Sequence, residues 1–207
     1  MVGHLAHELR QPLSAVESIS YYLRMVVPRQ DERTRQQLEK LEQLVDQMNW
    51  ILSDAVNYLQ AAAVCRQPID LAEGITEAIK ESGLDPALFR ITVTDGPLVV
   101  RMDPGQARHL MRSLYVWFDQ ITRGKSAIHV HACTAGGTAR LEVGAPGFAV
   151  SLDQMERMFE PFHPQAPAGS GLAMASARRI VENAGGRMEA HSEPLRGLRV
   201  IISLPPA

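Results

Sequence analysis

A regular seam of apolar residues near the N-terminus constrains the fold more strongly than any other feature of this 207-residue chain. Between residues 38 and 59, apolar side chains recur at spacings of three and four, which predicts a helix with a coiled-coil seam. Another helix is predicted before it, from about Val2 to Met25, and Pro12 should bend that helix because proline cannot donate to the helical ladder. The seam consists of Leu38, Leu41, Val45, Met48, Leu52, Ala55 and Leu59.

These two helices are expected to form a hairpin, because only a short turn separates them. The turn contains Pro28, and Asp31 is expected to cap the helix that follows. A hairpin of two helices has too little core to stand alone, so we expect two hairpins to pair as the four-helix bundle of a homodimer. The alternative is that the second helix packs its apolar face on another part of the same chain.

The first helix carries an apolar stripe, and a histidine lies almost opposite to it. At about 100° per residue the stripe should be the buried face, which leaves His7 in solvent beside Gln11 and Ser14. A neutral imidazole is nucleophilic near pH 7, and the carboxylate of Glu8 can orient it and take up its other proton. The alternative is a solvated histidine without a chemical role. The stripe consists of Leu5, Leu9, Pro12, Val16, Ile19 and Leu23.

The composition excludes several classes of protein. With 45% hydrophobic and 21% charged residues the chain is of the ordinary globular type, and a net charge of -2 creates no field that attracts nucleic acid or anionic membrane. No apolar run is long enough to span a bilayer, and no signal peptide is present. Cys65 and Cys133 form no close-spaced pair, which argues against a disulfide or zinc framework. We therefore expect a cytoplasmic chain, or the cytoplasmic part of a longer protein.

Near residues 62–68 the heptad pattern stops, which predicts one domain over residues 1–64 and another over residues 66–207. Helices and strands of the later domain do not alternate strictly, so we expect an α/β sandwich with helices on one face of a mixed sheet, and an α+β protein as a whole. The expected helices are 71–82, 103–121, 152–158 and 172–184, and the expected strands are 90–94, 98–102, 127–133, 139–143, 187–191 and 198–204.

Two parts of the sequence resemble the two-component sensor histidine kinases. The run from His7 to Leu13, HELRQPL, is similar to the H box of that family, and residues 169–194 are similar to the end of its ATP-binding domain. The resemblance extends from His7 to Pro205. It implies that His7 carries a phosphoryl group and that Glu8 assists as a base. It also implies a homodimer that meets the receiver domain of a response regulator, with Gln11 where the family places a residue that positions water.

The resemblance further implies an ATP site, but its motifs are only partly retained. The F box is intact from Phe159 to Phe162, and glycines remain at Gly147, Gly169 and Gly171. These residues could approach a nucleotide, or they could be scaffold that holds a helix against a sheet.

Two other positions of the implied ATP site have lost their chemistry. Trp117 stands where the family has a magnesium-binding asparagine, and an indole has no oxygen for a hard cation. Val143 stands where an aspartate reads adenine, and an unpaired polar edge of the base costs about 1–3 kcal/mol. A register shifted by a residue or two would instead use Asp119 or Glu142.

Three functions remain open from the sequence. The favoured one is phosphotransfer between His7 and a receiver aspartate, with no cofactor of its own; the others are an autokinase that uses Mg-ATP, and a docking module whose His7 has no chemical role. No metal site is expected, because His129 and His131 share one face of a strand without a third ligand nearby.

Overall fold

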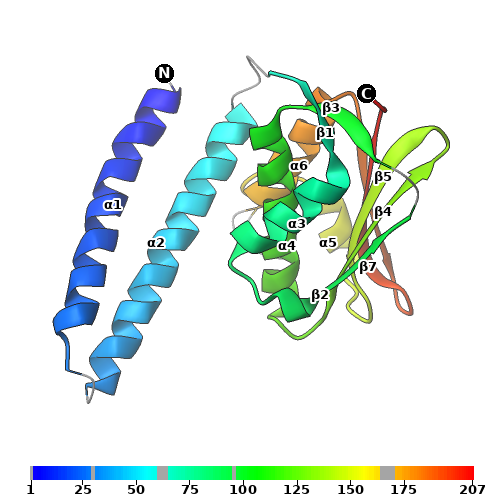
Figure 1. Ribbon diagram of the computed structural model, residues 1–207. Helices are drawn as coiled ribbons and strands as arrows, with labels where there is room; N and C mark the ends of the chain where they lie inside the picture. Colours follow the sequence, from blue (N-terminus) through cyan, green and yellow to red (C-terminus); the bar gives the residue numbers. More distant parts are fainter. Residues whose placement is uncertain (1, 29–30, 60–64, 95–96, 164–170) are drawn as a thin grey trace. The chain divides into compact units, whose positions relative to one another are not determined.

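The computed structural model describes residues 2–28, 31–59, 65–94, 97–163 and 171–207, with only the backbone for residues 2–6, 50 and 57. The chain divides into two compact units, residues 1–60 and residues 61–207 (Figure 1). Within the described ranges, no helix is both long enough and apolar enough to cross a membrane.

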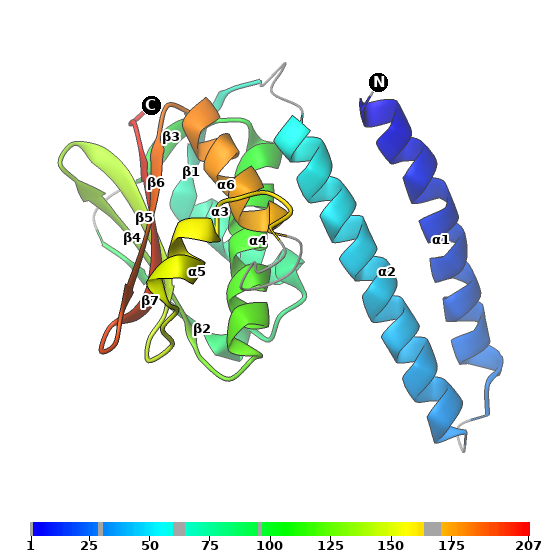
Figure 2. The same cartoon turned by 180° about the vertical axis from the view of Figure 1, so that it is seen from behind.

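The N-terminal unit is an antiparallel hairpin of helix α1, Val2–Val26, and helix α2, Glu32–Leu59 (Figures 1 and 2). The predicted cap of α2 is confirmed, because the backbone N–H of Thr34 donates to Asp31 Oδ1 at 3.1 Å. Arg24 of α1 pairs with Glu42 of α2, with 2.8 Å between Nη1 and Oε2. The turn and this ion pair fix the register of the hairpin at its closed end.

The predicted buried face of α1 is wrong for the single chain. Leu9, Ile19 and Leu23 remain 47%, 59% and 38% exposed. The face turned toward α2 contains Val16 of the predicted stripe, together with Leu13, both partly buried, and Ser20, which is fully buried. The sequence stripe combined two neighbouring faces of one helix, of which only one meets α2.

A continuous apolar face of the hairpin is left open. On α1 it consists of Ile19, Tyr22 and Val26, which follow each other at spacings of three and four and are 53–59% exposed. On α2, Leu44 and Met48 are 46% and 44% exposed, whereas Leu38 and Val45 of the predicted seam are buried. Each helix therefore carries one apolar stripe toward its neighbour in the hairpin and another toward solvent.

The C-terminal unit is an α/β sandwich, as the sequence predicts. Its five-stranded sheet has the order β2-β4-β5-β7-β6, in which only the β2–β4 pair is parallel. Helices α3, α4 and α6 cover one face of this sheet, and the short helix α5 lies near β6 (Figures 1 and 2). The strands are β2 Phe89–Val93, β4 Ile128–Ala135, β5 Thr138–Ala145, β6 Arg187–Glu193 and β7 Gly197–Leu204, and the helices are α3 Leu71–Ser82, α4 Pro104–Thr122, α5 Leu152–Arg157 and α6 Leu172–Asn183.

Side-chain caps start the helices where the sequence places them. Asp70 accepts from the backbone N–H of residue 72 before α3, and Asp103 accepts from residues 105 and 106 before α4. Ser151 and Gln154 form a capping box at α5. A short 3-10 turn, Pro86–Leu88, and a small antiparallel sheet of β1, Gln67–Asp70, with β3, Val99–Met102, complete the unit.

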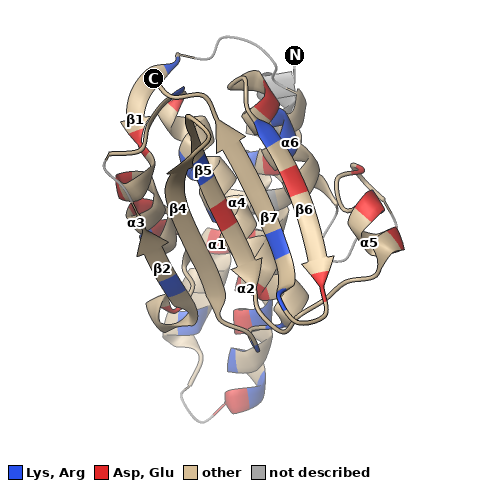
Figure 3. Cartoon of the chain, turned by 90° about the vertical axis from the view of Figure 1, so that its right-hand side faces the viewer, with Lys and Arg blue, Asp and Glu red and all other residues tan. Residues whose placement is uncertain are grey.

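No helix among the described residues of this unit covers the opposite face of the large sheet, which carries charged side chains of both signs (Figure 3). Arg140 pairs with Glu142 at 3.3 Å, Glu142 pairs with Arg199 at 3.3 Å, and Arg199 also pairs with Glu193 at 3.0 Å. Because strand side chains alternate, the same strands turn apolar residues toward the helices. The alternation separates a dry core from a polar outer face.

Candidate functional site

His7 lies on the solvent side of α1, as the periodicity predicts. Glu8 and Gln11 are exposed near it, while Pro12 continues the helix. Below the histidine, Arg10 Nη2 donates to Ser53 Oγ of α2 at 3.2 Å, which ties the two helices together at this level. The geometry leaves the imidazole accessible to a macromolecular partner, but its chemical role stays a prediction.

A polar groove runs between α1 and α2. It has a volume of about 510 Å³, and its lining contains three carboxylates, one guanidinium and the phenol of Tyr21. Ser18 belongs to it, with its hydroxyl donating to the Ser14 carbonyl at 2.8 Å. No pattern within either helix predicts this groove, because it depends on the register of the two helices. Its lining is Glu17, Ser18, Tyr21, Arg24, Glu42 and Asp46.

Trp117, in the position where the resemblance expects a magnesium ligand, is part of the core of the C-terminal unit. Its side chain is only 2% exposed and packs edge to face against Phe118, with ring centroids 5.2 Å apart. An indole in this place fills space that a coordinated ion and its water would need. The residue present does not fit a Mg²⁺ ligand.

Val143, in the position expected to read adenine, lies in a row of valines across the sheet. Its register partners are Val130 on β4 and Val200 on β7, and all three are at most 1% exposed. The neighbouring Glu142 points to the outer face, where it pairs with Arg199. A shift of one residue therefore cannot bring its carboxylate to the adenine position, since the strand alternation sends it away from the helices.

Asp119 is the acidic residue nearest to Trp117 along α4. Burial raises the pKa of its carboxyl group. It lies in the last turn of the helix, where its backbone carbonyl accepts from the N–H of Gly124 at 3.0 Å. Two residues along a helix rotate the side chain by about 200°, so Asp119 does not take the place of Trp117.

The glycine turn after β5 is held by the β6–β7 hairpin. Gly147 has φ +76°, a conformation that glycine adopts without strain. Gly197 packs against this turn so closely that a Cβ atom there would overlap the carbonyl oxygen of Ala145. Further along, the backbone N–H of Val150 donates to Ser192 Oγ at 2.9 Å. The turn that contains Gly147 is thus held in place beside the core by its contacts with the β6–β7 hairpin.

The F box follows α5. Phe159 is partly buried, and the guanidinium carbon of Arg178 lies 3.5 Å from its ring centroid. Phe162 is 65% exposed with φ +58°. Sequence reasoning missed Arg178, because it comes from α6, nineteen positions later in the sequence, and no local motif links it to Phe159.

Of the last glycine motif, Gly171 precedes α6 with φ +73° and is buried, whereas Gly169 lies outside the described residues. His131 Nε2 is 3.3 Å from Thr94 Oγ1. In the ranges that the structure covers, no three His, Cys, Asp or Glu side chains gather as metal ligands would.

Comparison with known proteins places this geometry in a family. Residues 102–207 match the family described as histidine kinase-, DNA gyrase B-, and HSP90-like ATPase. The match covers half of the chain and includes the elements of the sandwich from α4 to β7. The chain belongs to the histidine kinase family. Its hairpin fits the dimerisation and phosphoacceptor region that precedes the ATPase domain in these kinases.

Similar kinases extend the match to the hairpin. The sensor histidine kinase ZraS of Klebsiella oxytoca is 27% identical over 99% of this chain, and the methanogenesis regulatory histidine kinase FilI of Methanothrix harundinacea is 26% identical over 97%. These alignments cover 46% and 24% of the two relatives, so the chain spans less than half of their length.

Solved histidine kinases share the fold. Full-length ShkA in complex with AMPPNP has a TM-score of 0.74 at 20% identity, covering 99% of this chain and 45% of that one. ThkA in complex with the response regulator protein TrrA has a TM-score of 0.67 at 17% identity, covering all of this chain and 61% of that one. At the two positions where the resemblance implies ligands for ATP and its metal, this chain has the buried side chains of Trp117 and Val143.

Proposed function

We propose that this histidine kinase family member is a phosphotransfer protein that exchanges a phosphoryl group between His7 and an aspartate of a response regulator receiver domain. The observation that carries the proposal is the contrast between its two units. The hairpin keeps an exposed histidine in an H box, while the sandwich has an indole and a valine at two positions that Mg-ATP would require.

The exchange needs no nucleotide on this chain. In one direction the bond between phosphorus and the aspartate oxygen breaks, a bond to a ring nitrogen of His7 forms, and the carboxylate returns to the receiver. The attacking ring nitrogen gives its lone pair to the new bond, and the Glu8 carboxylate takes up the proton on the other ring nitrogen, so that the phosphorylated ring stays neutral. The receiver supplies the metal ion that neutralises the transferring group. Gln11, one turn along, is placed to hold water when hydrolysis competes with transfer.

The open apolar face supports a homodimer. Ile19, Tyr22 and Val26 of α1, with Leu44 and Met48 of α2, would be buried if two hairpins paired as a four-helix bundle. A contiguous exposed apolar face of this kind marks an interaction site in a soluble protein. In such a bundle, each His7 would remain on the outer surface.

The groove between the helices supports the receiver as partner. Ser14 and Ser18 lead from His7 toward the groove, where the carboxylates of Glu17, Glu42 and Asp46 outnumber the guanidinium of Arg24. A receiver that docks there should present basic side chains, and the on-rate should fall with rising salt.

A transfer assay tests the proposal. The full chain is mixed with a panel of receiver domains that have been phosphorylated with labelled acetyl phosphate, and label on the chain is followed by gel. We expect label on the native chain and none on His7→Gln. Gln11→Ala serves as the control, because it should take up label but change its rate of loss. Label that persists in His7→Gln, or no label from any receiver, contradicts the proposal.

An ATP-dependent autokinase is the alternative, and the relatives favour it, since those named above are histidine kinases. The retained Phe159, Gly147 and Gly171 are consistent with it. Incubation with labelled Mg-ATP distinguishes the two functions. Label on His7 without any receiver would establish the autokinase, whereas a chain labelled by neither route would be a docking module.

A further inference from the structure

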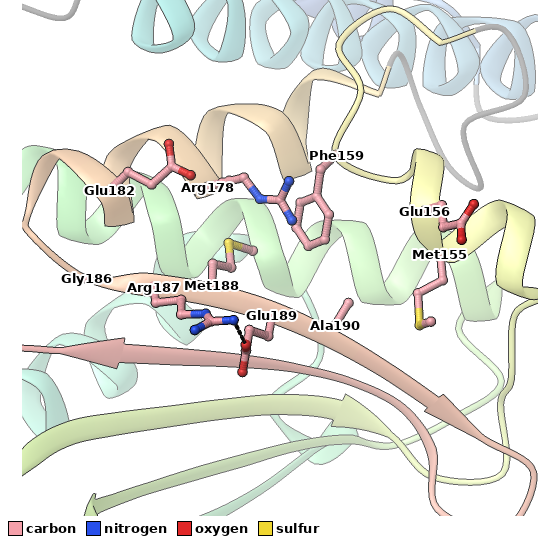
Figure 4. A pocket seen from close by; sticks show the side chains of 10 residues that line it. All are labelled: Met155, Glu156, Phe159, Arg178, Glu182, Gly186, Arg187, Met188, Glu189 and Ala190. Atoms are coloured by element: carbon pink, nitrogen blue, oxygen red, sulfur yellow. Dashed lines mark ion pairs between the residues drawn. The ribbon is translucent and has the colours of Figure 1, made fainter. Parts of the chain in front are cut away.

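A pocket of about 480 Å³ lies along β6, the last strand of the sheet (Figure 4). Gly186 and the four residues that follow it, up to Ala190, all line this pocket. Side chains of a strand alternate between the two faces of the sheet, so a pocket lined by consecutive residues must lie along the edge. In the described part of the chain, no strand pairs with this edge of β6. Alternate backbone N–H and C=O groups there can therefore accept a further strand.

The far wall of the pocket comes from α5, α6 and Phe159, and its apolar part consists of Met155 and Phe159. Met188 and Ala190 point from β6 toward the helices, while Met155 and Phe159 face them from the end of α5 (Figure 4). Arg178 of α6 lies flat on the Phe159 ring at 3.5 Å and fixes it in place. A side chain that entered from an added strand would meet two thioethers and a fixed aromatic ring.

The charges around the pocket favour a basic ligand. Arg187 and Glu189 neutralise each other at 2.6 Å, and Arg178 interacts with Glu182 as well as with the ring. Among the described residues, Glu156 has no ion-pair partner. Three carboxylates against two guanidiniums leave an excess of negative charge at the helix side of the pocket.

The shape favours a single strand over a whole sheet. Helix α5 projects beyond β6 when the sheet is viewed from its open face (Figure 3). A second folded domain approaching edge to edge would meet this helix, whereas one extended segment takes up only the width of a single strand along β6. Peptides that add to a sheet edge are held by backbone hydrogen bonds and selected by pockets for alternate side chains.

We propose that the edge of β6 binds an extended segment of a partner protein as a sixth strand. The segment places a large aliphatic side chain between Met155 and Met188, and a lysine or arginine beside Glu156. The site lies in the sandwich alone, so it is independent of phosphotransfer at His7. It would let a partner attach to this unit while the hairpin engages a receiver.

The test uses the full chain and an acetylated, amidated hexapeptide with the sequence Thr-Val-Thr-Lys-Thr-Val, in which the valines and the lysine lie on one face of an extended strand. We expect saturable shifts of the amide NMR signals of residues 186–190, and slower hydrogen exchange at alternate amides of β6. The same peptide with N-methylated alternate amides should lose binding, because it cannot bond to the edge. Glu156→Lys should weaken binding roughly fivefold or more, whereas Glu77→Lys, an exposed charge reversal on α3, should not.

Three results would overturn the proposal. The first is no shift at millimolar peptide, and the second is equal binding of the N-methylated peptide, which would mean side-chain contact without strand addition. The third is hydrogen exchange at β6 that is already slow without peptide and becomes slower as the protein concentration increases. This result would show that a second copy covers the edge. Both variants alter exposed residues, so their folding can be checked by an unchanged melting temperature.

Discussion

The open apolar face of the hairpin gives a quantitative prediction for Ile19→Ala. Complete burial of an isoleucine side chain contributes about 1.5–3 kcal/mol. Since 59% of Ile19 remains exposed in the single chain, pairing of two hairpins would gain about 1–2 kcal/mol for each copy. A dimer contains two copies, so the variant should lose about 2–4 kcal/mol of association free energy, which corresponds to roughly a 30- to 1,000-fold weaker dimer.

Sedimentation equilibrium over a concentration series measures this change directly. Alanine has the highest helix propensity, so the substitution leaves α1 itself intact. The matched control is Tyr21→Ala, because Tyr21 is 63% exposed but lines the groove on another side of α1. The control should leave the dimer constant nearly unchanged. A native chain that is monomeric at micromolar concentration, or an equal effect of both substitutions, would refute the assignment of this face.

Three further predictions concern the sandwich. Millimolar Mg-ATP should produce no rise in melting temperature, although a ligand at 100 times its dissociation constant adds about 2.7 kcal/mol; a clear rise would overturn the interpretation of Trp117. Gly197→Ala should lower the free energy of unfolding by about 2–4 kcal/mol in urea titrations, because it combines φ +76° with a clash at Ala145. Gly137→Ala, with φ +78° and open space, should cost much less, and equal losses would contradict the clash. Asp119→Asn should slightly raise the free energy of unfolding at pH 7, because burial raises the pKa of that carboxyl and disfavours its charge. This gain in stability should vanish as the pH falls below the ordinary aspartate range. A gain that persisted at that low pH would exclude this cause.

Local signals in the sequence were sufficient for most elements of the fold. The expected helices 71–82 and 103–121 agree with α3 and α4 to within one residue, and the expected strands 127–133 and 139–143 overlap β4 and β5. The strand β1 was missed because its four residues include a proline, and only its pairing with β3 makes it a strand. The predicted stripe of α1 combines Val16, which faces α2, with Ile19 on the open face, because a helix with two apolar stripes has no single buried side in its own sequence.

The candidate sites also fall into two groups, those that a local pattern predicts and those that form only when separate elements meet. The solvent position of His7 follows from periodicity, since the imidazole and the apolar residues lie on one regular helix. The contact between Arg178 and Phe159, the groove beside Tyr21 and the edge pocket all depend on pairs of elements that meet only after folding. No spacing within one segment encodes such contacts, so the sequence could not predict them.

The valine row across the sheet has an evolutionary consequence. A carboxylate introduced at Val143 alone would lie between Val130 and Val200 in a dry interior, where an unpaired charge costs several kcal/mol. An asparagine at position 117 alone would leave a void where the indole now fills the core, at a cost of about 3–5 kcal/mol. Each first step back toward a nucleotide site would cost a large part of the stability of a typical domain before any ligand could bind. The packing of Trp117 and Val143 therefore makes it difficult to build a nucleotide site in this sandwich by single substitutions.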